Sequence, residues 1–170
     1  IDGWETKKFD LVEIEKYVLQ KRWGIGIRNH ETLDFDNKGT PSAQELLTDW
    51  GQLVDKQLPG LIKKLLVEKT QHGGFHVIWN CIKKEGNLKL ASRPSTTIEL
   101  EKNSKAPAIS MVETRGIGGQ FVTAPTPGYK IIQGEWERII EITEDEMNIL
   151  LNCARQLDKM LKQEHMDSLN

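Results

Sequence analysis

The chain has 170 residues, of which 28% are charged and 38% are hydrophobic, and its formal net charge is −2. This length and composition predict a globular protein with a sizeable buried core and exclude an intrinsically disordered chain. No apolar run approaches the roughly 20 residues that cross a membrane. The slightly negative charge excludes the broadly basic surface of many nucleic-acid-binding domains.

The cysteines indicate where in the cell the chain is expected, and the first residue indicates whether it is a fragment. Cys81 and Cys153 lie far apart and match no metal-binding spacing, which favours a reducing, cytoplasmic location. The first residue is Ile1 rather than Met, so we expect a fragment of a longer protein, with residues 1–170 forming one domain. Any contact with nucleic acid is then expected to be local, weak or assisted by a neighbouring domain.

The first predicted helix begins near Asp10, which has the spacing of a capping box with Glu13. The segment GIGIR at residues 24–28 predicts a short strand. The turn at residues 30–31 predicts that this strand forms a hairpin with the strand that follows it.

The run TLDFDN at residues 32–37 places two carboxylates at alternate positions. Successive side chains of a strand point to opposite faces, so Asp34 and Asp36 are expected on one face, and Leu33 and Phe35 on the other. Two neighbouring carboxylates raise one another's pKa unless a cation lies between them. Hard divalent cations prefer carboxylate oxygens, so the run predicts a metal site. The alternative is an edge strand with a solvated face.

The next elements are a helix and two strands. The sequence at residues 40–43 predicts the start of the helix, with Pro41 in its first turn, and LPG at residues 58–60 ends it. The strands are expected at residues 65–67 and 75–81. The expected buried face of the helix consists of Leu46, Leu47, Trp50, Leu53 and Val54.

Alternation along the second of these strands separates His76 from Val77 and Trp79, so His76 is expected to face away from Trp79. The polar, poorly periodic segment at residues 83–105 predicts a loop-rich insertion with at most one short helix or strand. Its sequence SRPS at residues 92–95 interrupts any regular element.

The last third of the chain predicts four strands and a helix. The strands are expected at residues 108–114, 120–123, 129–132 and 139–142. The sequence TEDE at residues 143–146 forms a capping box that begins the helix. The expected buried face of this helix consists of Met147, Leu150, Leu151, Ala154, Leu157 and Leu161.

Three clusters contain residue types suited to phosphate and metal chemistry: DFD at residues 34–36, GGFH at 73–76 and VETRG at 112–116. Each has an ordinary structural explanation when taken alone. A Gly-Gly turn is common in hairpins, a single histidine is more often structural than catalytic, and an acid beside an arginine is often a weak surface ion pair.

Taken in order, the clusters resemble the motifs of the bifunctional primase-polymerase domain of phage and plasmid replication proteins, within the archaeo-eukaryotic primase superfamily. LDFDN at residues 33–37 is similar to the first metal motif of this family, TQHGGFH at 70–76 to the second, and the segment 112–125 to the third. Gly3, Trp4 and GIGI at 24–27 resemble its entry segment. The resemblance covers about residues 4–161.

The resemblance implies an α/β chain of the α+β class, in which mixed or antiparallel sheets form a catalytic cleft with flanking helices and an RRM-like subunit. It also implies an enzyme that carries out template-directed nucleotidyl transfer as a DNA primase, a DNA polymerase or both, in a bacterial or archaeal cell. The implied partners are NTP or dNTP, a single-stranded DNA template with its primer, and a fused or associated helicase, with no membrane.

Carried over by position, the resemblance implies that Asp34, Asp36 and Glu113 hold two Mg²⁺ or Mn²⁺ ions and form the catalytic set together with His76. The implied nucleotide-binding residues are Gly73, Gly74, His76 and Arg115, followed by Lys89 and Arg93 as weaker candidates.

Two positions depart from the family pattern: His72 stands where many relatives have a small residue such as Ser, and Glu113 stands where the acid is often Asp. Two other functions stay open from the residues. One is a non-catalytic module that binds nucleotides or nucleic acid within a replication protein. The other is a metal-dependent nuclease, because paired acids and a histidine also serve phosphodiester hydrolysis.

Overall fold

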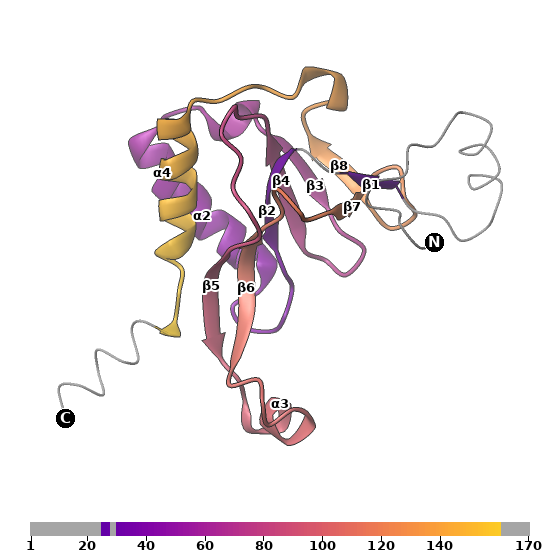
Figure 1. Ribbon diagram of the computed structural model, residues 1–170, viewed down its shortest axis with the longest axis vertical. Helices are drawn as coiled ribbons and strands as arrows, with labels where there is room; N and C mark the ends of the chain where they lie inside the picture. The colour runs from indigo at the N-terminus through magenta and orange to yellow at the C-terminus, as the bar shows by residue number, and fades with distance from the viewer. Residues whose placement is uncertain (1–24, 28–29, 161–170) are drawn as a thin grey trace.

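The computed structural model describes residues 25–27 and 30–160, and the structural statements below concern that part of the chain. The fold is α+β, with a six-stranded antiparallel sheet in the order β5-β6-β2-β4-β3-β8 and three α-helices (Figure 1). The strands of this sheet are β2 Glu31–Phe35, β3 Leu66–Lys69, β4 Phe75–Trp79, β5 Lys89–Pro94, β6 Ala108–Thr114 and β8 Lys130–Gln133.

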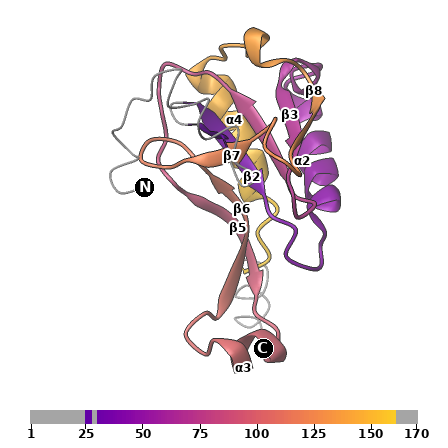
Figure 2. The same cartoon turned by 90° about the vertical axis from the view of Figure 1, so that its right-hand side faces the viewer.

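Two helices cover one face of the sheet (Figures 1 and 2). They are α2 Ala43–Gln57 and α4 Glu144–Arg155, and the main core between them and the sheet includes Trp50 and Trp79. The indole N–H of Trp50 donates to the carbonyl of Leu150 at 3.0 Å, which ties α2 to α4. Burial of a large apolar side chain is worth about 1.5–3 kcal/mol, so this layer stabilises the sheet from one side.

Each of these helices begins at a capping box. In α4 it is formed by Thr143 and Glu146, as the sequence predicts. In α2 the N-cap is Ser42, which pairs with Glu45, so the expectation that Pro41 lies in the first turn is wrong. Pro41 lies before the cap, where the amide of Glu45 donates to the hydroxyl of Ser42 and the amide of Ser42 donates to the carboxylate of Glu45.

Two further expectations are corrected by the pairing of strands. Strand β1 Ile25–Ile27 pairs with β7 Phe121–Thr123 and not with β2, so the predicted early hairpin is wrong. Both edges of β2 are occupied by β4 and β6, which leaves β1 no partner there. The segment at residues 139–142 forms no strand, and only Glu141 makes an isolated bridge, to Asn80.

The segment at residues 83–105 is more ordered than its sequence predicts. It contains all of β5 and the helix α3 Thr97–Lys102, where at most one element was expected. Pro94 does not break the sheet because β5 is an edge strand, where a missing N–H can face away from the neighbouring strand. The β5–β6 pair extends beyond the body of the fold with α3 at its tip (Figures 1 and 2).

The strand predicted at residues 108–114 is confirmed as β6. The helix expected near Asp10, the entry residues Gly3 and Trp4, and Leu161 lie outside the described residues. Within the described part of the chain, no helix is long and apolar enough to cross a membrane.

Candidate active site

Five ionisable side chains form one row across neighbouring strands, on the face of the sheet opposite α2 and α4. Residues that pair across antiparallel strands share a face, and the row follows directly from the pairing. From β5 to β3 it consists of Lys89, Glu113, Asp34, His76 and Glu68, each opposite the next. The row therefore joins residues that lie up to 79 positions apart, Asp34 and Glu113, into one polar strip.

The alternation predicted for β2 accounts for the centre of this row. Leu33 and Phe35 are fully buried in the main core, so the Asp34 side chain points to the other face. Asp36 follows the end of the strand, and its amide donates to the carbonyl of Met111 at 2.9 Å. This bond holds Asp36 beside β6, on the same side as Asp34.

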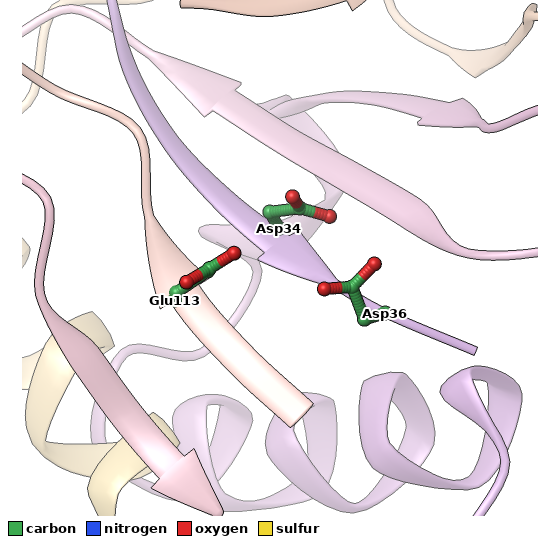
Figure 3. A group of neighbouring side chains, drawn as sticks. All are labelled: Asp34, Asp36 and Glu113. Carbon is green, nitrogen blue, oxygen red and sulfur yellow. The ribbon is translucent and has the colours of Figure 1, made fainter. Parts of the chain in front are cut away.

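The carboxylates of Asp34, Asp36 and Glu113 meet at this point (Figure 3). One oxygen from each lies within 4.8 Å of the others. Asp34 is only 9% exposed, and the other two are partly buried. The structure thus brings together the three acids of the first and third sequence clusters.

Burial raises the pKa of Asp34 above its ordinary value. The neighbouring charges of Asp36 and Glu113 raise the pKa further, whereas His76 and Arg115 lower it. Three acids so close together repel one another unless positive charge lies among them. A cation among the three carboxylates would therefore relieve their mutual repulsion.

Two cationic side chains contact the acids directly. The guanidinium of Arg115 bonds to Glu113 and lies 3.4 Å from a carboxylate oxygen of Asp34. The ammonium group of Lys38 lies 2.5 Å from Asp36. Lys38 was not among the predicted site residues, because only its adjacency to Asp36 marks it in the sequence.

His76 stands next to Asp34 with its ring edge toward the acids. Its Nε2 is 3.6 Å from Asp34 Oδ1, and its Nδ1 is 2.7 Å from Glu68 Oε1. Val77 and Trp79 lie in the main core, which confirms that His76 faces the opposite side of β4.

Glu68 is a site residue that the sequence analysis missed. Extending the strand at residues 65–67 by one position and counting alternation would have placed Glu68 on the face opposite Val67.

The glycine pair is explained in large part by packing. A Cβ on Gly74 would come within 2.5 Å of the carbonyl oxygen of Phe35, so the β3–β4 turn lies tightly against the end of β2. Gly73 has a φ of +80° and donates its N–H to the carbonyl of Thr70. Because that N–H is already used, the expected contact between Gly73 and a phosphate has no support from this geometry.

Lys89 and Arg93 differ in their surroundings although both lie on β5. Lys89 is exposed and stands opposite Glu113, at the end of the polar row. The guanidinium of Arg93 is bonded to Glu99 at 2.7 and 2.8 Å and to the carbonyl of Lys38 at 2.5 Å. The pair with Arg93 lowers the pKa of Glu99 to about 2, so Arg93 is an internally paired cation.

A groove of about 750 Å³ begins beside Asp36 and runs past β5. Its cationic lining residues are Lys38, Arg93 and Lys159, and its one acid, Glu99, is paired with Arg93. The remaining lining residues are Gly39, Thr40, Pro41, Pro94 and Thr96. The groove thus offers net positive charge next to the acidic cluster, in a chain whose total charge is slightly negative.

No protein-family model matches the chain, and no curated protein matches it either. The resemblance to primase-polymerase domains therefore stays a prediction from the sequence motifs.

Proposed function

We propose that this chain is the catalytic domain of a primase-polymerase that adds nucleotides to a primer on a DNA template during phage or plasmid replication. The observation that carries the proposal is the meeting of Asp34, Asp36 and Glu113 beside His76, from three adjacent strands. A catalytic cleft and an RRM-like subunit of the archaeo-eukaryotic primase type are part of this proposal, as are a bacterial or archaeal host cell and a fused or associated helicase.

The three acids have the chemistry and spacing for Mg²⁺ or Mn²⁺. Oxygen ligands about 2.0–2.1 Å from one octahedral ion are separated by about 3–4 Å. The separations of up to 4.8 Å between the carboxylates need only small side-chain rotations to reach that range, or suit two ions. Such ions supply charge stabilisation for the attacking and leaving oxygens of an in-line displacement.

The reaction that we propose joins the primer 3′-oxygen to the α-phosphorus of NTP or dNTP and breaks the bond to the β-phosphate oxygen, which releases pyrophosphate. Asp34, Asp36 and Glu113 hold the ions in this proposal. His76 directs Nε2 toward the nucleotide and donates a hydrogen bond to a phosphate oxygen. Its burial at 5% exposure keeps the ring in one place.

In this proposal two cationic side chains near the acids, Arg115 and Lys89, bind the triphosphate. Arg115 already lies between Asp34 and Glu113, and its planar guanidinium matches the geometry of phosphate oxygens. Lys89 lies one strand further along the row and provides a second, exposed positive charge. Gly74 remains a predicted close-approach position, since it is buried at the turn that faces Asn37.

The primer-template is proposed to follow the groove that starts at Lys38. Binding of a phosphate backbone depends on nearby Lys and Arg. The groove is lined by Lys38, which contacts Asp36, by Lys159, and by Arg93, which is paired with Glu99. This local arrangement supports nucleic-acid binding by a chain that is not basic overall.

One assay separates the proposal from its two alternatives. A labelled primer on a template is incubated with Mg²⁺ or Mn²⁺, with and without dNTP or NTP. Extension supports a polymerase, shortening indicates a nuclease, and retarded but unaltered DNA indicates a binding module. The double variant Asp34→Asn/Asp36→Asn is expected to lose the extension. The matched control is Asp49→Asn, an exposed acid on α2, which is expected to extend like the wild type.

A further inference from the structure

Glu68 has a fully buried carboxylate whose two oxygens are both occupied by hydrogen-bond donors. Its Oε1 is 2.7 Å from Nδ1 of His76. Its Oε2 accepts from the hydroxyl of Thr123 at 2.6 Å and from the amide of Ala124 at 3.0 Å. The residue itself is 0% exposed.

Part of the surroundings of Glu68 is apolar and gains nothing from a buried carboxylate. The same face of the sheet carries a small apolar cluster of Leu66, Ile78 and Phe121. A buried carboxylate is costly unless it is fully hydrogen-bonded, and an apolar side chain of similar size often stabilises such a position better. The carboxylate therefore indicates a task other than packing.

The carboxylate of Glu68 acts on the ring of His76. An ionised carboxylate only accepts hydrogen bonds, so the 2.7 Å contact requires a hydrogen on Nδ1. Two aromatic rings limit rotation of the imidazole: Phe121 at 5.1 Å in an edge-to-face contact, and Tyr129 at 6.2 Å. With Nδ1 held by Glu68, Nε2 is the nitrogen that faces Asp34.

We infer that Glu68 is a positioning residue, which fixes the ring of His76 so that Nε2 is the nitrogen offered to a nucleotide phosphate. This inference rests on the proposed function for its ligand, a nucleoside triphosphate. The partners of Oε2 connect Glu68 to a second sheet, because Thr123 belongs to β7 and Ala124 follows it. The small β1–β7 sheet is thereby tied to the histidine through a single carboxylate.

The hydrogen bonds around Glu68 determine what a Glu68→Gln variant does. Two donors point at the Oε2 position, so the carbonyl oxygen of the new amide belongs there. The NH₂ group then faces Nδ1 of His76, which has to accept, and the ring hydrogen moves to Nε2. A wild-type ring that donates from Nε2 to a phosphate while Nδ1 donates to Glu68 carries a hydrogen on both nitrogens and a positive charge. In the variant Nδ1 has to accept, so the ring carries one hydrogen and can donate from Nε2 only as a neutral group, which makes a weaker bond to phosphate.

The first measurement uses ¹⁵N-labelled protein without nucleotide and reads the two ring nitrogens of His76 by long-range ¹H–¹⁵N correlation. We expect a hydrogen on Nδ1 in the wild type and an acceptor at Nδ1 in Glu68→Gln. The Thr123→Val control removes one donor to Oε2 and should keep the wild-type pattern. An unprotonated Nδ1 in the wild type overturns the inference, and this reading needs no variant to fold.

The second measurement is a double-mutant cycle on the affinity for dNTP with Mn²⁺. Hydrogen-bond partners of metal-bound histidines are worth about 10–100-fold, and we expect a loss at the lower end of that scale for His76, so Glu68→Gln should weaken binding about tenfold. In a His76→Ala background the same change should have little effect, because Glu68 acts through that ring. Exposed Glu101 provides the control Glu101→Gln, with wild-type affinity expected.

The two failures are distinguishable. Equal weakening by Glu68→Gln in both backgrounds overturns the positioning role and leaves the proposed function standing. A wild-type protein that binds no nucleotide overturns the proposed function, while the ring-nitrogen spectra still decide whether Glu68 orients His76.

Discussion

Asp34 and His76 face one another across the β2–β4 pair, with Oδ1 and Nε2 3.6 Å apart, and both side chains are almost fully buried. The pair joins the acidic cluster on one side to the Glu68 carboxylate on the other. The polar row is therefore a connected set of partly buried ionisable groups. Burying such groups costs stability, and sets of this kind are typical of functional sites.

The Asp34→Asn variant is expected to lose activity and gain stability. The pKa of Asp34 is raised in the fold, so the folded state favours the neutral form and ionisation costs stability. This contribution is fully present below the unfolded pKa and is lost as the pH rises through the folded pKa. Asparagine stays neutral, so at pH 7 the variant should have a higher thermal midpoint than the wild type.

The measurement is thermal unfolding at pH 7 with and without Mg²⁺, together with primer extension. Mg²⁺ should raise the midpoint of the wild type and leave that of Asp34→Asn unchanged. A less stable variant that still responds to Mg²⁺ would contradict both the charge argument and the metal site.

Glu31 predicts a second pH dependence that has nothing to do with activity. Burial raises its pKa to about 7, although Oε1 accepts from the amide of Glu85 at 3.0 Å. Its Oε2 has no hydrogen-bond partner in the described part of the chain. Because the folded pKa lies above the unfolded value of 4.5, stability from the protonated form is lost as the pH rises through about 7.

Glu31→Gln should therefore be more stable than the wild type at pH 8, by about 1–2 kcal/mol, and similar to it at pH 5. The free energy of unfolding in urea at the two pH values measures this. A wild-type protein whose stability does not fall between pH 5 and pH 8 would rule out the argument.

Local sequence patterns predicted the face on which each side chain lies. Alternation in β2 separated Asp34 from Leu33 and Phe35, and the Thr143 capping box located the start of α4, because both depend on near neighbours. The motif order grouped Asp34, Asp36 and Glu113 before any pairing was known.

Long-range pairing is what the sequence patterns do not contain. The partner of β1 is β7, almost 100 residues away, and no local signal distinguishes it from β2. The register of β5 against β6 shifts twice. Each shift breaks the alternation of buried and exposed side chains by which a strand is predicted from sequence. Local alternation gives the face of Glu68 but not its role, since two of its three partners lie 55 and 56 positions away.

Gly74 should tolerate no side chain. A Cβ there would lie 2.5 Å from the Phe35 carbonyl and 2.9 Å from the hydroxyl of Thr70, so Gly74→Ala should cost about 1–3 kcal/mol. The same change at Gly86, where no atom lies within 4 Å of the added Cβ, is the matched control and should be nearly neutral. Chemical unfolding of both variants measures the difference. Equal stabilities would mean that the turn is not packed against β2.

The groove predicts that DNA binding depends on two cations of its lining, Lys38 and Lys159. Lys38→Ala/Lys159→Ala removes two lining cations and should weaken binding of a primer-template. Each lost phosphate contact reduces the slope of log affinity against log salt by about 0.7–0.9, so the double variant should lose about 1.4–1.8 units of slope.

The control variant Lys63→Ala/Lys64→Ala removes the same charge from two exposed lysines of the short helix η1 Ile62–Lys64, which does not line the groove. Its salt slope should match that of the wild type. Fluorescence anisotropy with a labelled primer-template at several salt concentrations compares the three proteins. If both double variants lose slope equally, the chain binds DNA through diffuse charge, and the groove beside Asp36 is not its path.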